Sequence, residues 1–114
     1  MEKISDLISF QETTKNAESS YFGFAINIKK NKIFDRSKFT RYLNQNGIET
    51  RPIICGNIAK QPVMKYYKYR SDKSLKCSTN IMNQSFSIGC HQSICDEAKW
   101  HVIKTFKNFF RKVC

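Results

Sequence analysis

Residues 47–62 read GIETRPIICGNIAKQP and decide how this chain folds. Gly47 follows an asparagine in a pattern that ends a helix, and residues 48–54 predict a short strand. Pro52 within this run has no N–H to donate to a neighbouring strand. We therefore expect a helix that passes directly into a strand, which lies at the edge of a sheet or is interrupted at Pro52.

The same stretch carries polar groups suited to binding. Arg51 can hold an anion through two parallel hydrogen bonds. Gly56 tolerates a positive φ and lets a ligand approach the backbone, and Asn57 offers an amide donor and acceptor in the same turn. These residues predict a binding site, although a surface strand with an incidental arginine would explain the stretch equally well on its own.

The helix before this stretch has both of its ends marked. Asp35 is a good N-cap for a helix over residues 36–45, and Phe34 and Phe39 stand at the two positions of a hydrophobic staple. The buried face of this helix should consist of Phe39, Tyr42 and Leu43.

Two further segments alternate apolar and polar residues as strands do. The first covers residues 20–28, and its predicted buried face is Phe22, Phe24, Ile26 and Ile28. Gly23 lies on the other face, where a glycine makes sense if another backbone or a ligand comes close. Residues 84–90 predict a third strand, preceded by a short helix over residues 75–83.

The last helix has the clearest periodicity. Ser93 and Asp96 have the spacing of a capping box at its start. His101 lies beside its buried face, where a structural role is expected rather than catalysis. That face recurs every three or four residues and should consist of Cys95, Ala98, Val102, Phe106, Phe109 and Val113.

The order of elements is therefore strand, helix, strand, helix, strand, helix. We predict an α+β fold in which a small, mostly antiparallel sheet of three or four strands carries helices on one face. With 114 residues, the chain is long enough for one domain with a modest core. We assign residues 20–114 to this domain and residues 1–19 to a lead-in segment with weak order.

The chain is strongly basic, with a net charge of +11. Basic residues crowd residues 60–76, where tyrosines interleave with them, and this pattern can bind single-stranded nucleic acid through stacking. We favour a loop or short helix over residues 60–74 that carries its tyrosines onto the domain or across a subunit interface. The scattered lysines indicate attraction for an anionic substrate more than for nucleic acid.

The five cysteines include no CxxC pair, and the first residues lack the apolar core of a secretory signal. We expect reduced, partly buried thiols. A Cys₃His zinc site is conceivable, but its spacing matches no common zinc module, so we expect no metal; its members would be Cys77, Cys90, His91 and Cys95. Because no apolar run approaches the roughly 20 residues that cross a bilayer, we expect a cytoplasmic protein with no membrane contact.

Three motifs in order resemble a known family. They are Ser20 to Ile26, the RP-x-x-x-GN-x-x-x-QP pattern of residues 51–62, and Ile88-Gly89-Cys90-His91-Gln92. Together they resemble the C-terminal small domain of the DegT/StrS family, over residues 19–110. These are pyridoxal-phosphate enzymes that act on nucleotide-linked keto-sugars. The second and third motifs are most similar to the 3-dehydratase branch, which makes 3,6-dideoxysugar precursors for lipopolysaccharide.

The resemblance implies a function and a set of site residues. The chain would close the nucleotide-sugar site of an NDP-4-keto-6-deoxyhexose 3-dehydratase or aminotransferase in O-antigen biosynthesis. The family uses pyridoxal phosphate or pyridoxamine phosphate, held by a large domain, and implies a homodimer. The substrate-binding residues carried over to this chain are Arg51, Gly56, Asn57, Phe22, Gly23 and His91.

The chemistry of the cofactor is missing from this sequence. The family holds its cofactor in the large domain, with an aspartate at the pyridine nitrogen and a lysine, or a histidine in the dehydratases, at the reacting carbon. Its aminotransferases carry an HY-x-PLH-like segment where this chain has residues 53–57, so no catalytic residue is carried over. We expect a truncated or split product that is inactive alone; the alternatives are a small basic nucleic-acid-binding module and an inactive remnant.

Overall fold

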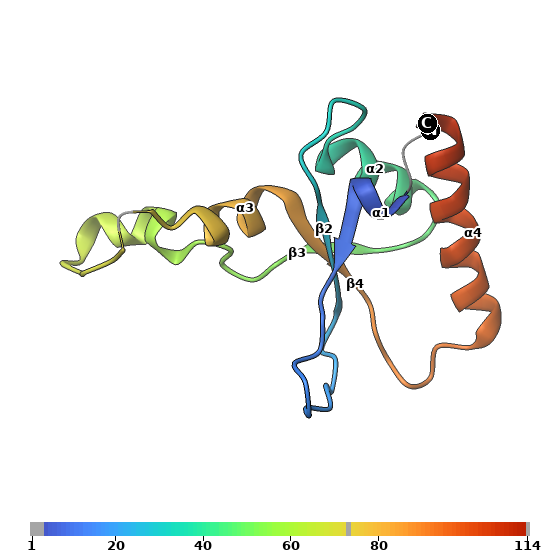
Figure 1. Cartoon of the computed structure of the whole chain (residues 1–114), viewed down its shortest axis with the longest axis horizontal. Coiled ribbons are helices and arrows are strands. Elements are labelled where there is room, and N and C mark those ends of the chain that lie inside the picture. The colour runs from blue at the N-terminus through green and yellow to red at the C-terminus, as the bar shows by residue number, and fades with distance from the viewer. Residues whose placement is uncertain (1–3, 73, 114) are drawn as a thin grey trace.

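Four antiparallel strands form one sheet in the order β1–β2–β4–β3. They are β1 (Ile8–Phe10), β2 (Phe24–Ile28), β4 (Ser85–Ile88) and β3 (Thr50–Pro52). The computed structural model describes residues 4–72 and 74–113. Two helices, α2 (Arg36–Gln45) and α4 (Asp96–Val113), lie on one side of the sheet (Figure 1). The predicted α+β fold is therefore confirmed.

The core lies between this sheet and the two helices, and Phe39 stands at its centre. The Phe39 side chain is 0% exposed. Its ring centroid lies 4.5 to 5.7 Å from those of five other phenylalanines, which are Phe34, Phe86, Phe106, Phe109 and Phe110. Such tilted and edge-to-face ring pairs add to the stabilisation that apolar burial supplies.

Helix α2 begins and ends where the sequence predicts. The Asp35 carboxylate accepts a hydrogen bond from the Lys38 N–H at 2.7 Å, and the Phe34 and Phe39 rings form the staple. At the other end Gly47 has φ +76°, and the Ile48 N–H donates to the Leu43 carbonyl at 3.0 Å. This Schellman turn sends the chain directly into β3.

Among the described strands, β3 pairs with β4 alone, so it lies at one edge of the sheet, a position that Pro52 tolerates. The opposite edge is β1, which follows the short helix α1 (Ile4–Leu7). Leu7 and Ile8 are both buried, so part of the expected lead-in contributes to the core. The division of the chain at residue 19 stays a prediction.

Two expected buried faces are shorter than the sequence suggests. Strand β2 starts at Phe24, and Phe22 is 92% exposed, so its place on the buried face was a wrong prediction. Helix α4 starts at Asp96, two residues later than a helix capped by Ser93 would, and Cys95 and Ala98 are exposed. Both differences have the same reason. In each case the apolar periodicity of the sequence continues beyond the residues that pack against the sheet.

Residues 53–84, which we call the arm, project from the sheet between β3 and β4 (Figure 1). The arm contains the 3₁₀ helices η1 (Ile58–Lys60) and η2 (Pro62–Tyr66) and helix α3 (Lys76–Gln84). Of its described residues, Asn57 alone is buried. The arm tyrosines do not pack onto the rest of the domain, which we call the body (residues 4–52 and 85–113), so that half of the prediction was wrong.

Candidate functional site

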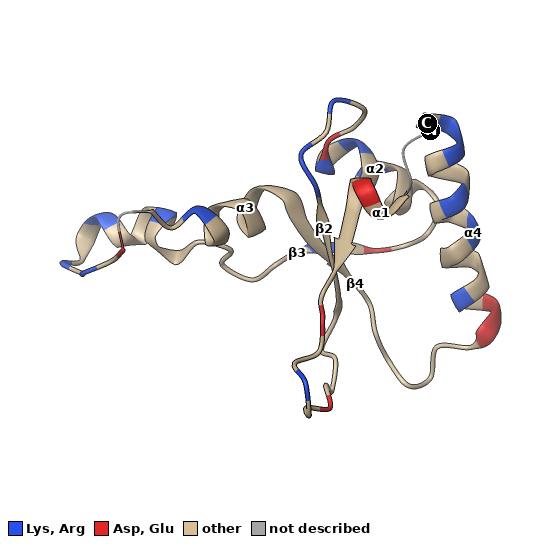
Figure 2. Ribbon diagram, viewed as in Figure 1, with Lys and Arg blue, Asp and Glu red and all other residues tan. Residues whose placement is uncertain are grey.

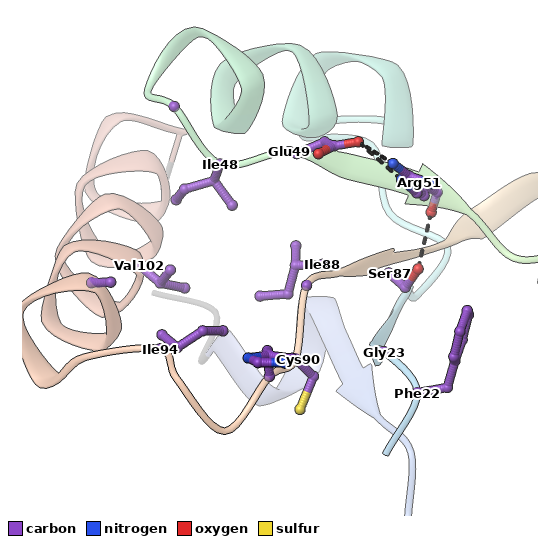
Figure 3. Close-up of a pocket in the computed structure, with 14 residues that line it drawn as sticks. Phe22, Gly23, Ile48, Glu49, Arg51, Ser87, Ile88, Cys90, Ile94 and Val102 are labelled. Atoms are coloured by element: carbon purple, nitrogen blue, oxygen red, sulfur yellow. Dashed lines mark hydrogen bonds and ion pairs between the residues drawn. The ribbon is translucent and has the colours of Figure 1, made fainter.

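A cleft of about 520 Å³ opens between β3, β4 and the first turns of α4 (Figure 3). Its floor is apolar, because four side chains from different elements point into it in Figure 3. Ile48 precedes β3 and Ile88 ends β4. Ile94 lies in the loop before α4, and Val102 lies within α4. Such an apolar concavity with polar groups at its rim is the usual form of a small-molecule site.

Arg51 supplies the positive charge at the rim. Its Nη2 lies 2.8 Å from Glu49 Oε1, and its Nε donates to the same oxygen at 2.9 Å. Both side chains are about three-quarters exposed, at 77% and 74%. An ion pair this exposed contributes about 0–1 kcal/mol. An anionic ligand can therefore replace Glu49 as the partner of the Arg51 guanidinium at little cost.

His91 lines the same cleft from the loop between β4 and α4. The Ser93 backbone N–H donates to His91 Nδ1 at 3.1 Å. In the neutral imidazole the proton then sits on Nε2, because the nitrogen that accepts a hydrogen bond carries none. Nε2 is thus available as a donor to a ligand oxygen.

Gly23 and Phe22 form the rim opposite α4. A Cβ at Gly23 would lie 3.4 Å from Ser87 Cβ, which is ordinary van der Waals contact with β4. Strand β4 therefore leaves room for a Cβ at this position, and the close approach of a ligand to Gly23 stays a prediction. Phe22 stands beside it with an almost fully exposed ring (Figure 3).

Gly56 and Asn57 lie outside the cleft, at the base of the arm. Gly56 has φ +51°, and a Cβ there would lie 2.5 Å from Met82 Cβ, so only glycine fits. Asn57 is 2% exposed; its Oδ1 accepts from the Ala59 N–H at 3.1 Å and its Nδ2 donates to Thr79 Oγ1 at 3.0 Å. Both residues join the outgoing chain to α3, and their contact with substrate stays a prediction.

The structure thus brings together four of the six predicted site residues: Arg51, His91, Phe22 and Gly23. It also adds Glu49, which the sequence analysis did not propose. The signal was present, because residues two apart in a strand share a face and Glu49 stands two before Arg51.

The thiols are more exposed than predicted. Four of them, Cys55, Cys77, Cys90 and Cys95, are free and exposed, which corrects the expectation of partial burial; Cys114 lies outside the described residues. Over residues 4–72 and 74–113, no three histidine, cysteine or acidic side chains gather as metal ligands do, and no helix has the length and hydropathy to span a membrane. His101 Nε2 lies 2.7 Å from the Asn46 carbonyl oxygen and ties α4 to the end of α2.

A model of the DegT/DnrJ/EryC1/StrS aminotransferase family matches residues 1–107. The chain belongs to this family. Among its relatives, the lipopolysaccharide biosynthesis protein RfbH of Salmonella typhimurium is 30% identical over 96% of this chain. The GDP-4-keto-6-deoxy-D-mannose 3-dehydratase of Escherichia coli is 32% identical over 81% of it.

Solved structures agree with this membership. A mutant of GDP-4-keto-6-deoxymannose-3-dehydratase (ColD) with bound GDP-perosamine matches 88% of this chain with a TM-score of 0.76 and 31% identity. The same enzyme with a trapped PLP-glutamate geminal diamine matches 83% with a TM-score of 0.72. The chain spans about a quarter of the length of these relatives, between 24% and 26%.

The cleft does not fit pyridoxal phosphate as a self-contained site. The residues that line it include one cation, Arg51, which is paired with Glu49, and they include no lysine amine. The cofactor of the DegT family would therefore need groups from outside this cleft.

Proposed function

We propose that this chain is the substrate-closing C-terminal domain of a DegT-family NDP-4-keto-6-deoxyhexose 3-dehydratase or aminotransferase for lipopolysaccharide sugars. The observation that carries the proposal is the shared position of Arg51, His91, Phe22 and Gly23 around one cleft. All four were chosen from motifs far apart in the sequence. The bound GDP-perosamine of the solved ColD relative supports a nucleotide-linked sugar as the ligand class.

Each rim residue has a role that its geometry supports. Arg51 exchanges Glu49 for the diphosphate of the nucleotide sugar, because bidentate charge-assisted hydrogen bonds are stronger than an exposed ion pair. His91 Nε2 donates to a phosphate or sugar oxygen. The apolar floor accepts the deoxygenated side of the hexose and excludes water when the cleft is closed.

The remaining three quarters of the enzyme would supply the cofactor site. The proposed enzyme uses pyridoxal or pyridoxamine phosphate, forms a homodimer and is cytoplasmic. We also propose that this chain alone is inactive. The described part of the chain binds and orients substrate in this view and moves no proton itself.

Reconstitution tests the proposal. The E. coli GDP-4-keto-6-deoxy-D-mannose 3-dehydratase would be made without the quarter that matches this chain, loaded with cofactor and mixed with the whole chain. We expect turnover of GDP-4-keto-6-deoxy-D-mannose by the mixture and none by either part. Arg51→Ala should raise KM about tenfold or more, the loss of one charge-assisted contact of roughly 1.5–3 kcal/mol.

The matched control is Arg41→Ala, which removes an exposed arginine on α2 away from the cleft. It should leave KM unchanged within twofold. A mixture without turnover, or an Arg51→Ala variant with the wild-type KM, would contradict the proposed function.

A further inference from the structure

The described part of the arm exposes large apolar side chains but has no apolar core of its own. Among the described residues, none of the buried apolar side chains lies in residues 53–84. Large apolar side chains are instead exposed along its length, and Tyr66 reaches 86% exposure. The others are Ile54, Ile58, Val63, Tyr67, Tyr69 and Ile81.

The internal contacts of the arm are polar and few. Its two limbs are joined by the Asn57–Thr79 hydrogen bond at 3.0 Å and by the packing of Gly56 against Met82. The Tyr69 hydroxyl donates to the Ala59 carbonyl at 3.2 Å. Ordering a segment costs conformational entropy that a handful of hydrogen bonds does not offset. We therefore expect a binding partner to cover the apolar side chains of the arm.

Charge narrows the choice of what covers the arm. Residues 53–84 contain six lysine or arginine residues and one aspartate. Figure 2 shows the basic residues of the described part of the arm spread along its length. A second copy of this chain also carries a net charge of +11 and would be repelled. The complementary surface is apolar at its centre and acidic at its rim.

We propose that the arm is the docking element of this chain, and that it packs against an acidic, apolar surface on the cofactor-binding portion of a DegT-family enzyme. The relatives are about four times as long as the segment matched here, so about three quarters of each lies outside that segment and is long enough to hold such a portion. This inference rests on the proposed function for the identity of the partner. It adds that docking depends on the arm, whereas the cleft in the body contacts substrate.

Tyr66 and Tyr67 anchor the contact. When a partner binds, an exposed tyrosine can bury a large area at a small cost in conformational entropy. Tyrosines are also enriched among the residues that dominate binding energy at protein interfaces. The neighbouring lysines, Lys65 and Lys68, steer the encounter through their charge, so they affect the association rate more than the lifetime of the complex.

The test measures binding in the absence of substrate. The probe is the cofactor-loaded E. coli 3-dehydratase without its matching quarter, used when its visible absorbance shows bound pyridoxal phosphate. Titrated with the whole chain, it should bind saturably. Tyr66→Ala and Tyr67→Ala should each weaken binding at least tenfold, and hydrogen exchange should slow in residues 53–84 when the probe is added.

Matched controls lie on the opposite side of the molecule. Trp100→Ala removes a side chain that is 67% exposed on α4 and should change binding less than twofold. Lys65→Glu with Lys68→Glu should slow association several-fold, and Lys104→Glu with Lys107→Glu on α4 should not. Arg51→Ala should bind the probe normally and lose substrate affinity, which separates failure of docking from failure of the proposed function.

Three results would overturn the inference. In the first, the probe does not bind, or the tyrosine variants bind as tightly as the wild type. In the second, light scattering detects a dimer of this chain that Tyr66→Ala dissociates, which would make a second copy the occupant. In the third, a 20-nucleotide single-stranded RNA binds through the same tyrosines and competes with the probe, with a steep dependence on salt.

Discussion

The body and the arm of this chain are built from similar residues but are stabilised in opposite ways. In the body, β2, β4, α2 and α4 surround a cluster of phenylalanines, with Phe39 and Phe86 almost fully buried. In the arm, residues of comparable size and hydrophobicity face outward, and Asn57 is the buried one among those described. The comparison shows that short helical segments can be present in the arm without an apolar core. The free energy of unfolding, in contrast, should come mainly from the core of the body.

The largest expected effect belongs to the centre of the body. Phe39→Ala would remove the ring around which five other phenylalanines pack and should cost about 3–5 kcal/mol in the free energy of unfolding. Urea denaturation followed by circular dichroism measures this loss. Tyr66→Ala in the arm is the matched aromatic control and should stay within about 0.5 kcal/mol. Similar costs for the two variants would erase the distinction between body and arm.

The next largest effects are expected from replacing two glycines that have positive φ, one in the arm and one in the body. Gly56→Ala at the base of the arm combines left-handed strain of about 1–2 kcal/mol with overpacking against Met82 of about 1–3 kcal/mol. Hydrogen exchange should accelerate in α3 and remain slow in β2 and β4. Gly47→Ala in the turn after α2 places its Cβ in open space, so it should cost the strain alone and destabilise the body. Equal acceleration everywhere in Gly56→Ala would show that the arm and body unfold together.

Arg36 connects the two regions, and its removal should have an intermediate effect. Its Nη1 donates to the carbonyls of Met82 at 2.8 Å and Ser85 at 3.2 Å, where α3 meets β4. Arg36→Met should cost about 1.5–3 kcal/mol, because hydrogen bonds to a charged group are lost. Arg41→Met on the same helix is the control. We expect faster exchange in residues 76–84, and a variant with unchanged exchange there would contradict this role.

The smallest effect concerns Glu97 at the exposed start of α4. A hydrogen bond from its own backbone N–H, followed by one from the Cys95 thiol, lowers the pKa of this carboxyl from its ordinary value. The unfolded chain therefore takes up the proton first as the pH falls. The contribution to α4 is complete above the ordinary pKa and is lost as the pH falls through the folded pKa. A carboxyl titration by NMR should give a Glu97 midpoint below that of an ordinary glutamate, and Cys95→Ala should raise it; a midpoint at or above the ordinary value would exclude the effect.

The sequence predicts the body better than the arm because its signals in the body are local. Asp35, the Phe34–Phe39 staple and Gly47 fix α2 to the residue, since each acts within one turn of the helix. Strand β1 was not predicted, because its three residues are strand only through pairing with β2, nearly 20 positions away. The exposure of Phe22 and Cys95 was also missed, since periodicity does not reveal where a sheet ends.

The candidate site was predicted in part for a related reason. Motif resemblance selected Arg51 and His91, which the fold places at one cleft, and also Gly56 and Asn57, which it places in the arm. A glycine and an asparagine in a tight turn give the same signal whether the close neighbour is a ligand or a helix. Only the tertiary structure shows that the neighbour here is α3.

The two edges of the sheet limit how the exposed apolar surface can be covered. Strand β3 is three residues long and includes Pro52, which offers no amide hydrogen, and β1 is equally short. Neither border gives an incoming strand a useful ladder of backbone groups. Whatever joins this molecule must therefore recognise side chains and contour, and the same two short borders protect it from stacking edge to edge into fibrils.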